Sequence, residues 1–191
     1  MTTAVKLPTR ERLLASTLEL LARGGYSAAS VAAITSGAGV AAGTLYRHFG
    51  SKEELFVELF REMCGREVDA MHEAAKSGDS PIGRLEAAIE TFARRALVQP
   101  RVSWALLAEP VDALVDAERL EYRRRYRDLV AELLTEAVAS GEIPECNAEV
   151  LAAAIVGGVG EALVGPLAAG RADTGALVKQ LRDFTRRAAG T

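Results

Sequence analysis

Val31-Ala32-Ala33-Ile34-Thr35-Ser36-Gly37-Ala38-Gly39-Val40-Ala41-Ala42-Gly43-Thr44-Leu45-Tyr46-Arg47-His48-Phe49 is the stretch that decides the fold. Val31 and Ile34 lie three residues apart, and Leu45 and Phe49 lie four residues apart after an interruption at residues 37–39, so each pair is about one helical turn. Two short helices joined by a glycine-containing turn form a helix-turn-helix, whose second helix enters the major groove of DNA. The stretch therefore predicts a DNA-binding motif.

Helix signals continue on both sides of this stretch. We expect a helix over residues 9–23, capped by Thr9 and ended by Gly24 or Gly25, and another over residues 30–36. Ser51 and Glu54 form a capping box that opens a long helix reaching about residue 76.

The remainder of the chain also has helical periodicity, and no strand-like alternation extends beyond a few residues. Asn147 and Asp173 are suited to cap the last two helices. The predicted fold is all-α, with about nine helices. The further helices are expected at residues 82–98, 101–109, 116–140, 148–164 and from 174 onward.

Residues 9–56 resemble the DNA-binding domain of the TetR family of one-component transcription regulators. Three segments carry the resemblance: Arg23-Gly24-Gly25-Tyr26, the run from Gly39 to Phe49, and Ser51-Lys52-Glu53-Glu54-Leu55-Phe56. The resemblance implies a three-helix DNA-binding domain over residues 1–50, with the start of a connecting helix at 51–56. A larger helical bundle for ligand binding and dimerisation would then occupy residues 57–191.

The resemblance also implies which side chains meet DNA. Thr44 and Tyr46 would donate to phosphates, Lys52 would add a cationic contact, and Arg47 would reach a guanine or a phosphate. The alternative for Tyr46 and His48 is that they only close the three-helix core. Ala42 stands where a Lys or Arg is common in relatives, which weakens direct base readout. The predicted DNA-binding set is Ser30, Ala41, Ala42, Gly43, Thr44, Tyr46, Arg47, His48 and Lys52.

The charge distribution fits localised DNA contact. The 191-residue chain has a net charge of −3, but residues 1–56 hold six Lys or Arg and four Asp or Glu, and the remainder holds 17 and 22. A mildly basic end on an acidic body indicates a DNA contact confined to that end. The N-terminal segment has no apolar secretion signal, so we expect a cytoplasmic protein. The two cysteines match no metal spacing, and we expect neither a metal nor a cofactor.

Aromatic residues at helical spacing in the body predict a cavity for an unknown small-molecule effector. Ordinary core packing is the alternative for each of them. Glu109 would be suited to meet a cationic ligand. The predicted cavity residues are Phe92, Trp104, Glu109, Tyr122 and Tyr126. The arginines at 123–125 and 127 are interpreted as a solvated face rather than a second nucleic-acid site.

Small residues on one face of the helix predicted near residues 148–164 indicate a subunit contact, because they let two helix backbones approach closely. A transmembrane span over residues 150–170 is the weaker interpretation, because Glu161 and Pro166 interrupt it. Packing within one subunit is the other alternative. The predicted homodimer interface comprises Ala154, Gly158, Ala162, Gly165, Leu177, Leu181 and Phe184.

Two other function classes compete with this interpretation. An enzyme is disfavoured because the sequence has no phosphate-binding glycine loop and only two histidines, one of them in the predicted DNA-reading helix. A helical scaffold would leave the pattern from Gly39 to Phe49 unexplained. The sequence therefore predicts a ligand-responsive repressor that binds a palindromic operator in double-stranded DNA as a homodimer and is released by a small molecule.

Overall fold

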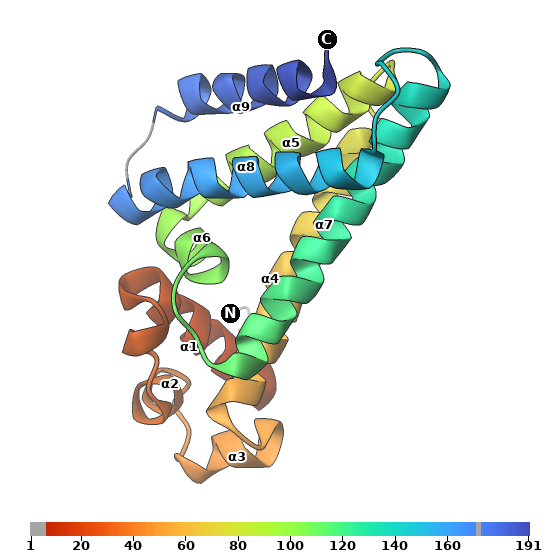
Figure 1. Ribbon diagram of the computed structural model, residues 1–191. Coiled ribbons are helices and arrows are strands. Elements are labelled where there is room, and N and C mark those ends of the chain that lie inside the picture. The colour runs from red at the N-terminus through yellow and green to blue at the C-terminus, as the bar shows by residue number, and fades with distance from the viewer. Residues whose placement is uncertain (1–6, 171–172) are drawn as a thin grey trace, which may run out of the picture.

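The computed structural model describes residues 7–170 and 173–191, and this part of the chain is all-helical (Figure 1). Nine α-helices lie within it, as the sequence predicts. They are α1 (Thr9–Gly24), α2 (Val31–Gly37), α3 (Gly43–Phe49), α4 (Lys52–Ala75), α5 (Pro81–Val98), α6 (Pro100–Leu107), α7 (Ala113–Ala139), α8 (Ala148–Ala169) and α9 (Thr174–Ala189). A short 3₁₀ turn, Tyr26–Ala28, follows α1.

The first three helices pack with the start of α4 around a small apolar core. Leu13, Ile34, Leu45 and Leu55 supply one buried side chain from each of these helices, and all four are fully buried. Burial of such a side chain stabilises the fold by roughly 1.5–3 kcal/mol. This core places α3 at the end of the molecule that lies farthest from α9 (Figure 1).

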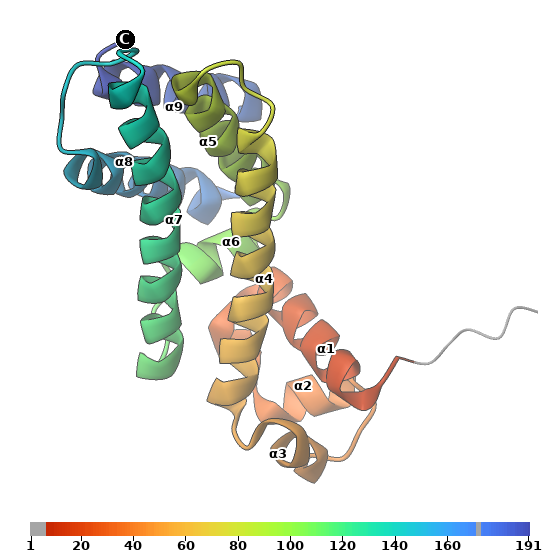
Figure 2. The ribbon, with the colours of Figure 1, turned by 90° about the vertical axis from the view of Figure 1, so that its right-hand side faces the viewer.

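The long helices α4 and α7 run side by side and join this end to the rest of the body (Figure 2). α5 packs against α4, α9 covers α5, and α8 crosses α7. α6 lies between α1 on one side and α8 on the other. α4 and α6 are therefore in direct contact with the helices at the end that holds the predicted helix-turn-helix.

Most of the predicted helix starts are confirmed. The Ser51 hydroxyl accepts a hydrogen bond from the Glu54 amide at 3.0 Å, and Asn147 and Asp173 cap α8 and α9. The Thr9 cap is wrong, because Pro8 occupies the N-cap position and no side chain closes that end of α1.

Two predicted helices in the body are too short. α7 begins at Ala113 because Asp112 caps it, accepting from the amides of Leu114 and Val115. α8 continues through Pro166, whose ring removes a hydrogen bond to the carbonyl of Ala162. Ala162 is exposed, so water can bind that carbonyl and the helix need not end there.

Within the described residues, α8 alone is long and apolar enough to cross a membrane by length and composition. Only 28% of its most apolar window is buried in the single chain, and Ala154, Ala162 and Gly165 are among its exposed residues.

Candidate functional site

α2 and α3 meet through a tight turn that fixes their relative orientation. Gly39 adopts φ 64°, a left-handed conformation that a residue with a side chain rarely tolerates. Ile34 from α2 and Leu45 and Phe49 from α3 are buried on the inner side of the motif. The predicted helix-turn-helix is therefore formed, with its outer face free.

Two polar side chains of α1 brace this turn from behind. The Arg12 guanidinium donates from Nε to the Ala38 carbonyl at 2.9 Å and from Nη2 to the Gly39 carbonyl at 3.0 Å. The buried Ser16 hydroxyl donates to the Ile34 carbonyl at 2.8 Å. The carbonyls of Ala38 and Gly39 follow α2 and have no helical partner, so Arg12 supplies one. The Ile34 carbonyl accepts from the Ala38 amide at 2.9 Å as well as from Ser16.

Replacing Arg12 with methionine should destabilise the protein by about 1.5 kcal/mol, because hydrogen bonds from a charged group to a part-buried and an exposed carbonyl are lost. Urea unfolding of the variant measures the change. Arg23→Met is the matched control on the same helix, because Arg23 makes only an exposed pair with Glu19 and should change stability by less than about 0.5 kcal/mol. Equal unfolding midpoints for the two variants would contradict the bracing role.

The residues predicted to meet DNA gather on and around α3. Those at the start of the helix and along its outer face are exposed: Ala41, Ala42, Gly43, Tyr46, Arg47 and His48. Thr44 points inward and is only 9% exposed, and its hydroxyl accepts from Arg47 Nη2 at 3.1 Å. Thr44 therefore positions Arg47 in this structure.

The two outlying members of this set lie at helix starts. The Ser30 hydroxyl caps α2 by accepting from the Ala33 amide at 3.2 Å. The ammonium group of Lys52, at the start of α4, sits 4.6 Å from the centre of the Tyr26 ring and 5.8 Å from that of Phe56. Cation–π contact with two rings restrains the Lys52 side chain.

A cavity of about 700 Å³ occupies the body between α4, α5, α6, α7 and α8. Its size is within the usual range for small-molecule sites. Buried apolar and aromatic side chains line its interior, among them Phe60, Met71, Ile89, Val102 and Leu167. Leu18 of α1 also reaches its wall.

Three of the five predicted cavity residues lie in this wall and two do not. Phe92, Tyr122 and Tyr126 line the cavity, and the ring centres of Phe92 and Tyr126 are 5.4 Å apart. Trp104 lies outside the lining, where the Arg101 guanidinium stacks 4.5 Å from its ring centre. Glu109 is buried at the junction with α1 instead, where it accepts from the Tyr26 amide at 3.0 Å.

Two titratable side chains in the cavity wall are held in their neutral forms by burial. Cys64 lies in the wall, and burial raises the pKa of its thiol to about 12. A thiol with this pKa stays protonated at neutral pH and is a poor nucleophile. Burial likewise raises the pKa of the Tyr126 hydroxyl, which therefore remains neutral.

The sequence predicts a solvated face for Arg123 and Arg127, and these exposed residues also form a basic rim of the cavity. Arg123 and Arg127 are exposed, lie one turn apart on α7 and line the cavity. In the part of the chain that the structure describes, neither forms an ion pair, whereas their neighbour Arg124 pairs with Glu121 and Asp128. Arg123 and Arg127 are four residues apart, and each directly follows one of the predicted cavity residues Tyr122 and Tyr126. That pattern could have predicted that they lie at the cavity.

The predicted dimer residues fall into two groups. Ala154, Ala162 and Gly165 are exposed on α8, and Leu177 and Phe184 of α9 are half-buried. Leu181 is buried within the subunit, and a side chain at Gly158 would come within 2.9 Å of the Phe184 ring. Gly158 and Leu181 thus hold α9 on its own subunit.

Comparison with known proteins gives a consistent picture. The family described as "Bacterial regulatory proteins, tetR family" matches residues 13–59, and "Tetracyclin repressor-like, C-terminal domain" matches residues 78–164. The fatty acid metabolism regulator protein of Bacillus subtilis is 27% identical over 147 residues, which cover 73% of each chain. The transcriptional repressor KstR of Mycobacterium tuberculosis is 31% identical over 137 residues, covering 71% of this chain and 61% of its own length.

A solved structure has the same fold. The transcriptional regulator FadR from Bacillus subtilis, in complex with stearoyl-CoA, superposes with a TM-score of 0.80 at 24% identity over 92% of this chain and 96% of its own. These relatives are transcription regulators rather than enzymes. The two family matches, one on the helix-turn-helix and the other on most of the body, establish the assignment. The chain therefore belongs to the TetR family of ligand-responsive, DNA-binding transcriptional repressors.

Proposed function

We propose that this repressor binds a palindromic operator as a homodimer in the cytoplasm and leaves it when a long-chain acyl-CoA occupies the cavity. The observation that carries the proposal is a single cavity that combines an apolar interior with two exposed arginines, Arg123 and Arg127, at its rim. A fatty chain with a phosphate-bearing head has this same division into apolar and anionic parts.

The exposed start of α3 supports the DNA-binding part. Ala41, Ala42 and Gly43 are small enough to let the helix approach base edges, and an alanine methyl can touch a thymine methyl. Tyr46 and Arg47 would contact phosphates or a guanine beside them, and His48 would contact the backbone. Ser30 and Lys52, at the two flanking helix starts, would add phosphate contacts.

The outward face of α8 supports the homodimer. It is apolar, and its exposed Ala154, Ala162 and Gly165 would let a second copy of the helix approach closely. Leu177 and Phe184 would extend the contact onto α9. Two DNA-binding domains related by a two-fold axis match a palindromic site, and one domain alone would bind only weakly.

Calorimetric titration with palmitoyl-CoA, palmitate and coenzyme A tests the effector. We expect palmitoyl-CoA to bind at least about tenfold more tightly than either half, because the apolar interior and the basic rim then act together. If palmitate bound as tightly as palmitoyl-CoA, the arginines at the rim would not contact the phosphates of the coenzyme A part. No binding of any of the three would refute an acyl-CoA site.

Removing the two rim charges should weaken palmitoyl-CoA binding by about ten- to a hundredfold, since each lost charge-assisted hydrogen bond costs roughly 1.5–3 kcal/mol and part of this is recovered by water. The variant is Arg123→Gln combined with Arg127→Gln. Arg124→Gln is the control, because Arg124 is on the same helix but pairs with Glu121 and lies outside the cavity. Calorimetry should show that the control binds palmitoyl-CoA within about twofold of the wild-type affinity. If the double variant also kept that affinity, Arg123 and Arg127 would not be part of the binding site.

A further inference from the structure

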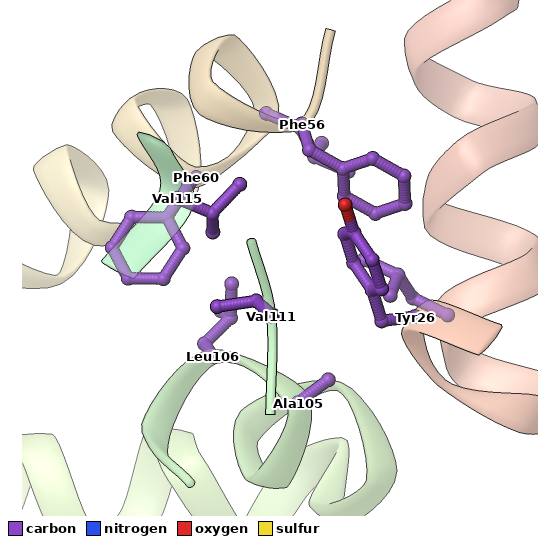
Figure 3. Close-up of a pocket in the computed structure, with 9 residues that line it drawn as sticks. Tyr26, Phe56, Phe60, Ala105, Leu106, Val111 and Val115 are labelled. Carbon is purple, nitrogen blue, oxygen red and sulfur yellow. The ribbon is translucent and has the colours of Figure 1, made fainter. Parts of the chain in front are cut away.

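Helix α6 forms the partition between the cavity and the DNA-binding domain. Val102, Ser103 and Leu107 line the cavity. Ala105 and Leu106 border a void of only about 10 Å³ toward α1 and α4, whose other walls include Tyr26 and Phe56. Figure 3 shows Ala105 and Leu106 below this junction, with the Tyr26 and Phe56 rings beside it. Because so little space is left, a shift of α6 must displace the residues on its far side.

Arg119 of α7 holds the C-terminal end of α6 in place through hydrogen bonds. Its guanidinium donates from Nε to the Leu106 carbonyl at 3.0 Å, and from Nη2 to the carbonyls of Glu109 at 2.8 Å and Ala105 at 3.4 Å. The carbonyls of Ala105 and Leu106 lie in the last turn of α6, where no helical partner exists. The side chain is only 13% exposed, yet it also lines the cavity. Burial lowers the pKa of this guanidinium.

The loop between α6 and α7 carries two carboxylates that hold Tyr26. Glu109 accepts from the Tyr26 amide at 3.0 Å and pairs with Arg101 at 3.3 Å. Asp112 accepts from the Tyr26 hydroxyl, and hydrogen bonding holds the pKa of the Asp112 carboxyl below its usual value although burial opposes this. The Tyr26 ring packs 4.4 Å from that of Phe56.

The loop between α6 and α7 packs closely against the turn that follows α1. Gly25 has φ 73°, and a side chain there would collide with Arg101 and Glu109. The turn after α1 is therefore shaped to receive the loop, and its position depends on where the loop sits.

We propose that Arg119 is the positioning residue that transmits occupation of the cavity to the DNA-binding domain. It does so by holding the α6–α7 loop in the position where Glu109 and Asp112 accept hydrogen bonds from Tyr26. An effector in the cavity lies against the same guanidinium and offers its own oxygen acceptors in place of the loop carbonyls. The loop then moves, Tyr26 loses its two partners, and the DNA-binding domain leaves the orientation that fits the operator. The chemical identity of the effector and its place in this cavity rest on the function proposed above, whereas the hold of Arg119 on the loop does not.

Hydrogen exchange tests this link without any effector. The probe is the Tyr26 amide, followed by mass spectrometry of a peptide spanning residues 22–29 in the full-length protein. In Arg119→Met we expect this amide to exchange at least about tenfold faster than in the wild type, because its acceptor is no longer held in place. Arg61→Met is the control: it removes an exposed pair with Glu118 between α4 and α7 and should leave the rate within about twofold.

Arg119→Lys provides the same test if the methionine variant does not fold, because an ammonium group cannot replace a guanidinium that donates to three carbonyls at once. A wild-type Tyr26 exchange rate in whichever folded Arg119 variant is measured overturns the proposal.

A second experiment measures how strongly palmitoyl-CoA lowers the affinity for the operator. The variant is Glu109→Met, which removes the acceptor of the Tyr26 amide. Glu109 lies outside the cavity, so palmitoyl-CoA should bind this variant as it binds the wild type. The ratio of operator affinities without and with palmitoyl-CoA should fall by at least about fivefold. An unchanged ratio overturns the proposal. Failure of palmitoyl-CoA to bind the wild type refutes the proposed effector instead, and the exchange experiment still decides the role of Arg119.

Discussion

An Ala42→Glu variant should lose specific operator binding, with affinity falling about a thousandfold or more to the level of non-specific binding. Ala42 is exposed at the N-cap of α3, where the helix would meet the DNA. A carboxylate there faces the phosphates and bases in both subunits of a dimer. Negative charge near a helix N-terminus is stabilising, so the fold should be retained.

Fluorescence anisotropy with an operator selected from random DNA measures this loss, and circular dichroism checks the fold. Ala22→Glu is the matched control, because Ala22 is exposed on α1 and should cost at most a few-fold through net charge. If the folded Ala42→Glu variant kept wild-type affinity, α3 would not be the helix that reads DNA.

The second large effect is expected at α8, where Ala162→Arg should convert the dimer into monomers. Ala162 is exposed in the single chain, so an arginine there does not disturb the subunit itself. At a close helix–helix contact it would introduce a bulky and unpaired charge, which typically costs several kcal/mol. Operator affinity should then fall toward the weak binding of a single domain.

Sedimentation equilibrium gives the mass of the assembly directly. Ala139→Arg, at an exposed position at the end of α7, should remain dimeric. A dimeric Ala162→Arg protein would place the subunit contact elsewhere. Gly158 is unsuited to this test, because any side chain there meets Phe184 of the same subunit.

The helix-turn-helix could be predicted from the sequence because its signals are local. The glycines at 37 and 39, the apolar pairs at spacings of three and four, and the Ser51 cap all act within a few residues. Tyr46 and Arg47 are exposed, as a DNA-binding role requires. Thr44 points inward because its position in the helix faces the core.

The contacts between the two parts of the molecule could not be predicted in the same way. Glu109 was a candidate for a cationic ligand, but Glu109 and Asp112 both meet Tyr26, more than 80 positions earlier. Arg119 binds backbone carbonyls, which any residue type supplies, so its role leaves no mark in the sequence. Such contacts depend on how α6 and α7 pack, which periodicity does not specify.

The proposed regulation depends most on one effector that acts through one cavity. The direct test is anisotropy of the selected operator bound to the wild-type protein, titrated with palmitoyl-CoA and, separately, with coenzyme A. We expect palmitoyl-CoA to release the operator and coenzyme A to leave it bound, with release shifted to higher palmitoyl-CoA concentration in the double variant of Arg123 and Arg127. An operator that stays bound at saturating palmitoyl-CoA would contradict the account.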